Sequence, residues 1–202
     1  MGLFGLFRKT EQGEADVESE RSVSGDNGDV SSRGASVRDA ETYRALADVL
    51  VDDATARAKL DAWIDDPNLY CQEAGNERGV DDCAGREDEV MWLALVDTLI
   101  DGSRQAVEID WCGETEDLVW SLNSITKEPA LHLDEDGLSE EDLTACFDEV
   151  NVIWNPQGWV LAYMDIDSDS YVLVPLRVDQ FEAAEPLAAR LDKTLIQAHQ
   201  GL

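Results

Sequence analysis

Two apolar runs in the last quarter of the chain, GWVLAYMDI and YVLVPL, are separated by only the four residues 167–170. Both are rich in β-branched and aromatic residues, which predicts two strands. So short a connection joins antiparallel neighbours, because parallel strands need a crossover of about a dozen residues or more. Apolar residues at consecutive positions indicate that both faces of these strands are covered. The chain is therefore predicted to contain an antiparallel hairpin in the middle of a sheet.

Helix and strand patterns surround this hairpin in a definite order. Residues 104–111 (RQAVEIDW) alternate roughly and predict an earlier strand, and two helical segments follow before the hairpin. A helix at about 179–191 and a terminal strand in KTLIQAH come after it. This order is β, broken α, β, β, α, β, which is that of a ferredoxin-like, split βαβ fold. We expect an α+β protein with a four-stranded antiparallel sheet and helices on one face.

The pattern before residue 103 is helical. Tyr43, Leu46, Ala47 and Leu50 share one helical face, and REDEVMWLALVDTLI is apolar over most of its circumference. These helices are expected to pack against the sheet. Residues 39–202 are accordingly predicted to form one α+β domain, with a helical part at 39–102 and a sheet part at 103–202.

Residues 1–38 lack such patterning. The opening MGLFGLF is apolar, and the stretch after it is rich in Ser, Gly and charged residues without periodicity. Such a stretch buries too little apolar surface to offset the entropy lost on ordering. We expect an acidic, disordered tail with a short apolar tip.

The charge of the chain narrows the classes of partner. Forty-five Asp and Glu residues oppose fifteen Lys and Arg residues, which gives a net charge of −30. Nucleic acid and anionic membrane surfaces are not expected as partners, because both require clustered Lys and Arg. Two interpretations of the acidity stay open. It either forms a face that meets a basic protein, or it is background composition that maintains solubility. The spread of the acids along the chain favours the second.

The four cysteines, Cys71, Cys83, Cys112 and Cys146, show no metal-binding pattern. No C-x-x-C pair occurs, and no His is close to any of them in sequence. We expect no signal peptide at the start of the chain, and no apolar run reaches the length of about 18 residues that suits a membrane helix. We therefore expect reduced thiols, a cytoplasmic location and no stable membrane insertion.

The strongest candidate site lies in the connection of the hairpin. Asp165, Asp167 and Asp169 alternate there, and Tyr171 follows two residues later. Alternate residues of a strand point the same way about 7 Å apart, so three carboxylates could converge on a divalent cation. The Gly and Glu that a helix–loop–helix calcium site requires are missing. We favour a turn in which the Asp and Ser side chains accept backbone hydrogen bonds, and keep the cation site as the alternative.

His132 is a second candidate, because HLDEDG places it beside Asp134 and Asp136. A His with carboxylates can bind a metal or act as an acid–base pair, and Cys112 or Cys146 could pair with it as a nucleophile. A solvated loop is the interpretation that we favour, since nothing local activates either thiol. Serine hydrolase, phosphate-loop and dinucleotide-binding patterns are absent, and no cofactor is predicted.

Several tryptophans fall near the edges of the predicted elements. Trp is enriched at binding hot spots, so a stripe of exposed indoles would indicate a recognition surface. Core packing is the role that we expect for Trp111, Trp120, Trp154 and Trp159.

Three sequence blocks carry a family resemblance. They are MWLALVDTLI with W-x-A-L-x-D, VEIDWCGETEDLVWSLN with D-W and D-x-x-x-x-L, and YMDIDSDSYVLVPL with D-x-D-S-D-x-Y. In this order they resemble a small bacterial cytoplasmic family of unknown function, over roughly residues 40–198. The resemblance implies domain limits and no particular activity. In size, charge and fold class the chain is also similar to toxin-neutralising immunity proteins.

The expected function is thus a non-enzymatic acidic module that binds a basic protein, of the immunity-protein type by that analogy. One alternative is a divalent-cation-binding domain that uses Asp165, Asp167 and Asp169. The other is a hydrolase that uses His132 with neighbouring carboxylates.

Overall fold

The computed structural model describes residues 31–80, 83–138 and 142–202, with side chains from residue 39 onward. The helices in these ranges are α1 (Ser31–Leu50), α2 (Ala54–Asp65), α3 (Pro67–Glu73), α4 (Glu87–Asp97), α5 (Thr115–Ile125), α6 (Leu143–Trp154) and α7 (Val178–Arg190). The strands are β1 (Val107–Asp110), β2 (Trp159–Met164), β3 (Ser170–Arg177) and β4 (Leu195–Gln197). Short helical turns lie at η1 (Gly75–Arg78), η2 (Thr98–Gly102), η3 (Pro129–Leu131), η4 (Glu135–Gly137) and η5 (Asn155–Gln157).

The four strands form one antiparallel sheet in the order β1-β3-β2-β4. The predicted hairpin is its centre, with Met164 opposite Val172 and Trp159 opposite Arg177. An α+β fold with a four-stranded antiparallel sheet is therefore confirmed. Since β1 and β2 are both antiparallel to β3, they run parallel to each other with β3 between them, as in a split βαβ unit.

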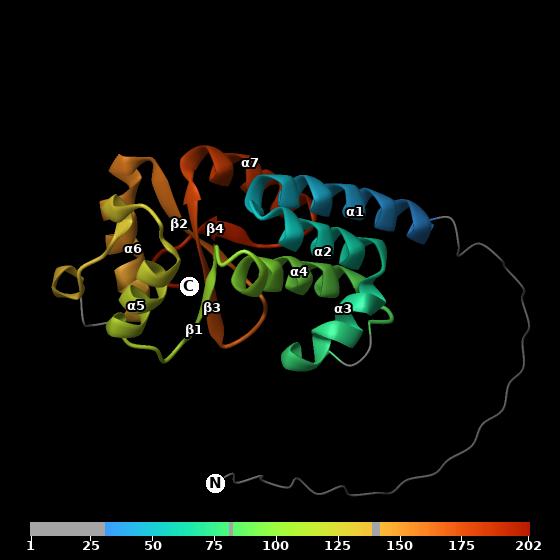
Figure 1. Cartoon of the computed structure of the whole chain (residues 1–202), viewed down its shortest axis with the longest axis horizontal. Coiled ribbons are helices and arrows are strands. Elements are labelled where there is room, and N and C mark those ends of the chain that lie inside the picture. Colours follow the sequence, from blue (N-terminus) through green and yellow to red (C-terminus); the bar gives the residue numbers. More distant parts are fainter. Residues whose placement is uncertain (1–30, 81–82, 139–141) are drawn as a thin grey trace, which may run out of the picture.

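The last strand lies beside β2, whereas a ferredoxin-like order would place it beside β1. This position explains where α7 packs. The crossovers β1-α5-α6-β2 and β3-α7-β4 start from oppositely directed strands and move toward the same edge. If both have the usual right hand, they must place their helices on opposite faces of the sheet. Helices cover both faces as a result, as the consecutive apolar residues of the hairpin indicated, whereas the split βαβ order alone suggested helices on one face (Figure 1).

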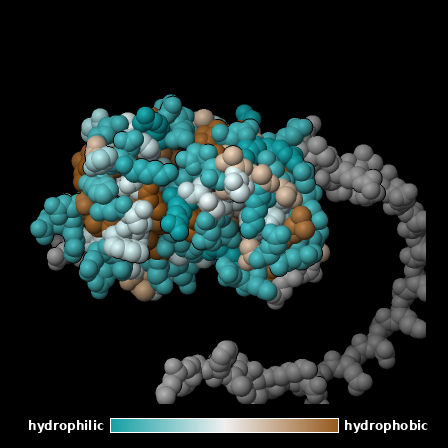
Figure 2. All heavy atoms as spheres, in the orientation of Figure 1, coloured by the Kyte–Doolittle hydropathy of each residue, from teal (hydrophilic) through white to brown (hydrophobic). Residues whose placement is uncertain are grey.

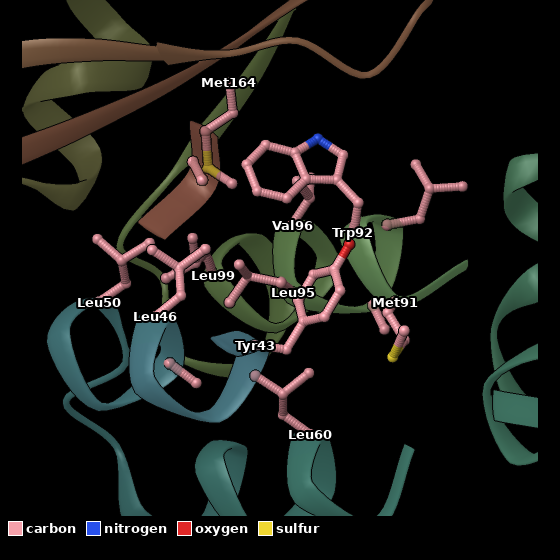
Figure 3. Close-up of a cluster of buried hydrophobic side chains, with 14 of the residues drawn as sticks. Tyr43, Leu46, Leu50, Leu60, Met91, Trp92, Leu95, Val96, Leu99 and Met164 are labelled. Carbon is pink, nitrogen blue, oxygen red and sulfur yellow. The ribbon is translucent and has the colours of Figure 1, made fainter. Parts of the chain in front are cut away.

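Alternation along the hairpin divides the apolar side chains between two cores. Val160, Ala162 and Met164 face a core built by α1, α2, α4 and α7. Leu161 and Tyr163 face a second core built by α5 and α6. Figure 3 shows the first core, in which leucines of α1 and α4 meet around Tyr43 and approach Met164 of the sheet. The apolar circumference of α4 has its physical reason here, because that helix is enclosed by its neighbours.

Local signals account for where several helices begin. Asp53 accepts hydrogen bonds from the first-turn N–H groups of α2, and Asp142 caps α6 in the same way. Pro67 opens α3 behind the cap Asp66. The structure begins α1 at Ser31, eight residues before the start expected from the apolar pattern, and the GLFGLF tip lies outside the described residues.

The expectation of reduced thiols is wrong for two of the four cysteines. Cys71 and Cys83 form a disulfide, with their Cα atoms 6.2 Å apart. They are 12 positions apart, and the turn η1 folds the intervening chain back so that the two meet. No local spacing pattern indicates this pair, because the contact depends on the chain folding back after α3. Cys112 and Cys146 form no disulfide with any described residue.

Candidate functional site

The connection between β2 and β3 is a turn fixed by its own aspartates. The Asp165 carboxylate accepts the Asp167 N–H at 2.9 Å, and Asp167 has a left-handed backbone with φ of 54°. Asp tolerates this conformation better than most residues. The indole N–H of Trp92 donates to the Asp165 carbonyl at 2.6 Å and ties α4 to this turn.

The other two predicted site residues, Asp169 and Tyr171, make separate contacts. Asp169 is exposed, and its backbone carbonyl accepts a hydrogen bond from the backbone N–H of Trp111 at 3.1 Å. Tyr171 packs edge-on against Phe147 and Tyr163, with ring centroids 5.3 and 6.0 Å apart, so its ring belongs to the second core. Within residues 39–202, leaving aside the gaps, no three His, Cys, Asp or Glu side chains are grouped to hold a metal ion. The three aspartates are therefore not brought together around a common centre.

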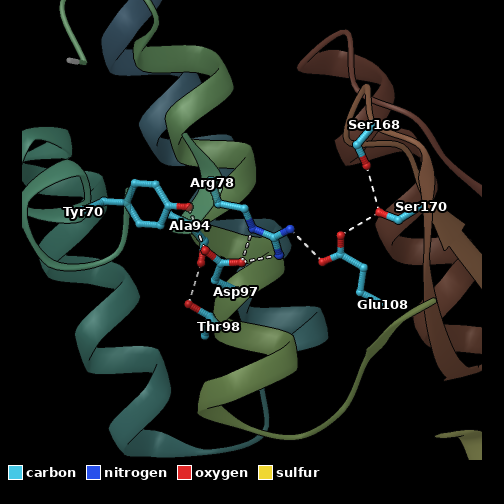
Figure 4. A network of polar contacts seen from close by, with 8 residues as sticks. All are labelled: Tyr70, Arg78, Ala94, Asp97, Thr98, Glu108, Ser168 and Ser170. Atoms are coloured by element: carbon cyan, nitrogen blue, oxygen red, sulfur yellow. Dashed lines mark hydrogen bonds and ion pairs between the residues drawn. The ribbon is translucent and has the colours of Figure 1, made fainter. Parts of the chain in front are cut away.

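A polar network joins the helical half to the sheet beside this turn (Figure 4). The Arg78 guanidinium donates to Asp97 at 2.8 and 2.5 Å and to Glu108 on β1 at 2.6 Å. Tyr70 donates its hydroxyl to the other Asp97 oxygen at 2.7 Å, and Ser170 of β3 donates to Glu108 at 2.6 Å. Asp97 stands where α4 gives way to the π-helical turn η2.

The charged groups of this network are paired with one another, as expected for a structural contact between the helices and the sheet. Burial alone would lower the pKa of Arg78, but its hydrogen bonds to Asp97 and Glu108 raise the pKa above its usual value. Burial, followed by the hydrogen bond to Asp97, raises the pKa of Tyr70. Both groups thus keep their protons, and the carboxylates facing them are paired. Such a pair specifies how two layers meet, and breaking it would leave an uncompensated charge between them.

The three blocks of the family resemblance converge on this place. The first contributes Trp92 and Asp97, the second Glu108, and the third Asp165 and Ser170. The third block bonds directly to the first through Trp92 and to the second through Ser170, whereas Arg78, which lies outside the blocks, links the first to the second. The blocks therefore share a structural role.

An acid-lined pocket of about 260 Å³ opens on the other side of Asp97, between α2, α3 with η1, and α4 with η2. Its polar lining includes Glu73, Glu77 and Asp101 as well as Asp97. A single cation, Lys59, is among its lining residues, and the Lys59 ammonium lies 4.4 Å from the centroid of the Trp63 ring. The same ammonium is 3.9 Å from the Glu73 carboxylate, which also accepts the Trp63 indole N–H at 3.2 Å. An aromatic face with carboxylates beside it is a suitable environment for an ammonium or guanidinium group.

The geometry gives little support to a catalytic role for His132, Cys112 or Cys146. His132 is exposed in the loop after η3, and Asp134 accepts the Asp136 N–H at 3.4 Å as the cap of η4. The hydrogen bond to Asp110 raises the pKa of the exposed Cys112 thiol, and burial raises the pKa of Cys146. A raised pKa keeps a thiol protonated and unreactive.

The tryptophans divide into two groups. Trp154 is fully buried and donates to the Leu131 carbonyl at 3.0 Å, and Trp159 is half-buried beneath Arg177. Core packing is the wrong expectation for Trp111 and Trp120, which are 63% and 73% exposed. Trp120 is two positions from Leu118 and Leu122 on α5, so it projects from the opposite side of that helix.

Sequence reasoning missed the acid-lined pocket altogether. Its acids come from α3, η1, α4 and η2. Glu73, Glu77 and Asp101 are exposed residues of their own segments, and Asp97 is half-buried. The one local signal was Trp63 one turn after Lys59, which is also the normal spacing of a helix face.

Comparison with known proteins identifies the family of the chain. None of the described helices is both long enough and apolar enough to span a membrane. No curated protein and no solved structure matches the chain. A family model described as Domain of unknown function (DUF6630) matches residues 42–199, which is most of the chain and includes all three sequence blocks, and the chain therefore belongs to this family.

Proposed function

We propose that this domain is a non-enzymatic module that binds a basic protein through the acid-lined pocket between α2, α3 and α4. The observation that carries the proposal is the environment of Lys59. Its ammonium already rests against Trp63 and beside Glu73, so the pocket accepts a cation of the kind that a partner's Lys or Arg would supply.

The remaining acids of the pocket support the same proposal. Glu77 and Asp101 are exposed and form no ion pair with any described residue, whereas Asp97 and Glu73 are engaged by Arg78 and Lys59. Two carboxylates therefore stand ready for an incoming cation. The net charge of −30 adds a long-range field that speeds the approach of a basic partner. Figure 2 shows hydrophilic residues over most of the visible face, as such a surface requires.

The setting that we propose is a bacterial cytoplasm, as the family resemblance implies. The Cys71–Cys83 disulfide would be unusual there, because cytoplasmic thiols are normally kept reduced. Alkylation of free thiols at the moment of cell lysis would show which state prevails, and a fully oxidised pair would contradict the proposed compartment.

The test of binding compares three immobilised proteins in native lysate. They are the natural chain, the double variant Glu77→Gln with Asp101→Asn, and the matched control Glu182→Gln with Glu185→Gln. The control removes the same two charges from exposed positions of α7, away from the pocket. Captured proteins are identified after elution as salt rises from about 0.1 M to about 1 M, over which the Debye length falls from about 10 Å to about 3 Å.

We expect a basic protein that the natural chain and the control retain at low salt and that the pocket variant releases or fails to capture. A basic protein held equally by all three would show that overall charge acts without the pocket. Capture of no basic protein at low salt would overturn the proposed function.

A further inference from the structure

A second cavity, of about 250 Å³, lies at the end of the sheet away from the aspartate turn. It is bounded by the start of β2, the end of β3, the loop before β1 and the segment that follows α5. Trp159, Ile125, Leu131, Pro175 and Leu176 give it apolar walls. This cavity shares no residue with the acid-lined pocket, so a ligand bound in it would be independent of the proposed function.

Cations that form no ion pair with a described residue gather at this cavity. Among the residues with described side chains, five Lys and Arg residues form ion pairs, namely Arg44, Arg57, Lys59, Arg78 and Arg86. All five lie in the helical part before β1. The other five described cations form none. Of these, Arg104 and Lys127 line the cavity, and Arg177 stacks on its Trp159 wall with the guanidinium carbon 5.1 Å from the ring centroid. The remaining two, Arg190 and Lys193, lie elsewhere. Cations without ion pairs are unexpected in a chain with three acids for every base.

The backbone around these cations is held in place. Arg104 has a left-handed backbone with φ of 53°, which is uncommon for a residue other than Gly and is tolerated where the surroundings impose it. Its neighbour Gln105 donates to the Leu50 carbonyl at 3.0 Å and accepts the Asp52 N–H at 3.2 Å. Gln180, on the opposite wall, donates to the Val49 carbonyl at 3.2 Å. Both glutamines fasten the cavity to the end of α1, so its shape exists before any ligand arrives.

We propose that this cavity binds a small aromatic carboxylate. The apolar walls accept the ring, and Arg104 and Lys127, both of which line the cavity, attract the carboxylate. Two acids, Asp52 and Glu128, also line the cavity and balance those two cations. Arg177 then makes the local charge positive, which leaves room for a single negative charge. The volume limits the ligand to about one ring with a short side chain.

The experiment uses three ligands with the same ring and a different charge: phenylacetate, phenylacetamide and phenethylamine. Binding to the full chain is measured by saturation-transfer NMR and by shift titration. The net charge of −30 attracts the amine and repels the acid. Tighter binding of the acid can therefore come only from cations close to the site.

We expect phenylacetate to bind with a dissociation constant below about 1 mM, a realistic range for about ten heavy atoms. It should bind at least tenfold more tightly than either of the other two ligands. The double variant Arg104→Gln with Lys127→Gln should lose that preference and weaken phenylacetate binding at least tenfold. Arg190→Gln is the matched control, since this cation forms no ion pair with any described residue but lies at the far end of α7 from Gln180, and it should bind like the natural chain.

Three results would overturn the proposal. They are amide or amine binding as tight as that of the acid, unchanged phenylacetate binding in the double variant, and no saturation by phenylacetate. Thermal unfolding of each variant verifies that the fold is retained, and Lys127→Gln alone, at an exposed position, serves if the double variant does not fold. The cavity and the acid-lined pocket share no residue, so the result of the capture experiment does not affect the result of the phenylacetate experiment. Either proposal can therefore fail while the other holds.

Discussion

Replacing Asn151 with Ala should be among the most damaging single substitutions at a polar residue of this domain. Asn151 is 2% exposed on the apolar face of α6. Its side chain accepts the Leu161 N–H at 2.8 Å and donates to the carbonyls of Ala198 at 2.9 Å and Leu161 at 3.3 Å. One side chain thus connects a helix, the central strand β2 and the segment after β4.

The size of the effect depends on which partners remain without it. The Leu161 carbonyl keeps the Ala198 N–H at 2.9 Å, so it stays satisfied. The Leu161 N–H and the Ala198 carbonyl lose the hydrogen bonds that Asn151 gives them, in residues that are fully buried. Each buried group left unsatisfied costs about 1–3 kcal/mol, so the loss should be about 2–6 kcal/mol in all. That is a large share of the roughly 5–15 kcal/mol that stabilises a typical domain.

Urea unfolding monitored by tryptophan fluorescence measures this loss, because Trp154 is buried in the same core. Asn155→Ala is the matched control, an exposed Asn just past the end of α6, and it should change the free energy of unfolding by less than about 0.5 kcal/mol. An Asn151→Ala variant within about 0.5 kcal/mol of that control would refute the reasoning.

Three further perturbations have defined outcomes. Cys71→Ser should lower the free energy of unfolding by about 3 kcal/mol, the chain-entropy value for a loop of this size, and Cys112→Ser should not; equal stability in the presence and absence of reductant would contradict this. Burial, then the charge of Asp165, raises the pKa of Tyr163 to about 12, so the folded state holds this proton more tightly than the unfolded state. The protonated Tyr163 therefore contributes fully to the free energy of unfolding below about pH 10, and this contribution is lost as the pH rises toward 12. Tyr163→Phe should flatten the decline in stability over that window. An unchanged decline in the variant would contradict the raised pKa. Calorimetry with calcium, magnesium and manganese should give the same heats for the natural chain and Asp167→Asn, whose amide tolerates the left-handed backbone; any heat that depends on Asp167 would restore the cation site.

The helices and strands with a periodic pattern were predictable, because the spacing of their apolar residues shows which faces are buried. The runs that became β2 and β3, and the all-round apolar pattern of α4, follow directly from which faces are covered. The placement of β4 was not predictable in this way. Its three residues pair equally well with either edge strand by composition, and the choice of β2 rests on tertiary packing.

The candidate sites show the same division between local and long-range information. The aspartate turn was visible because Asp165 and Asp167 bond within two residues of each other. The Arg78 network spans contacts of 19 and 30 positions, and the disulfide partners meet through a folded-back turn. Nothing in a sequence window indicates such partners. The two cavities also draw their walls from segments that are far apart in the chain.

The central hairpin restricts how the length of this chain can change over evolution. Odd positions of β2 serve the core of α5 and α6, and even positions serve the core of the other helices. A deletion of one residue inside β2 would turn Tyr163 toward the space that Ala162 now fills, and would exchange the two cores along the rest of the strand. Single-residue insertions and deletions should therefore be confined to the connections between elements. Within β2 and β3, changes in length should come in steps of two.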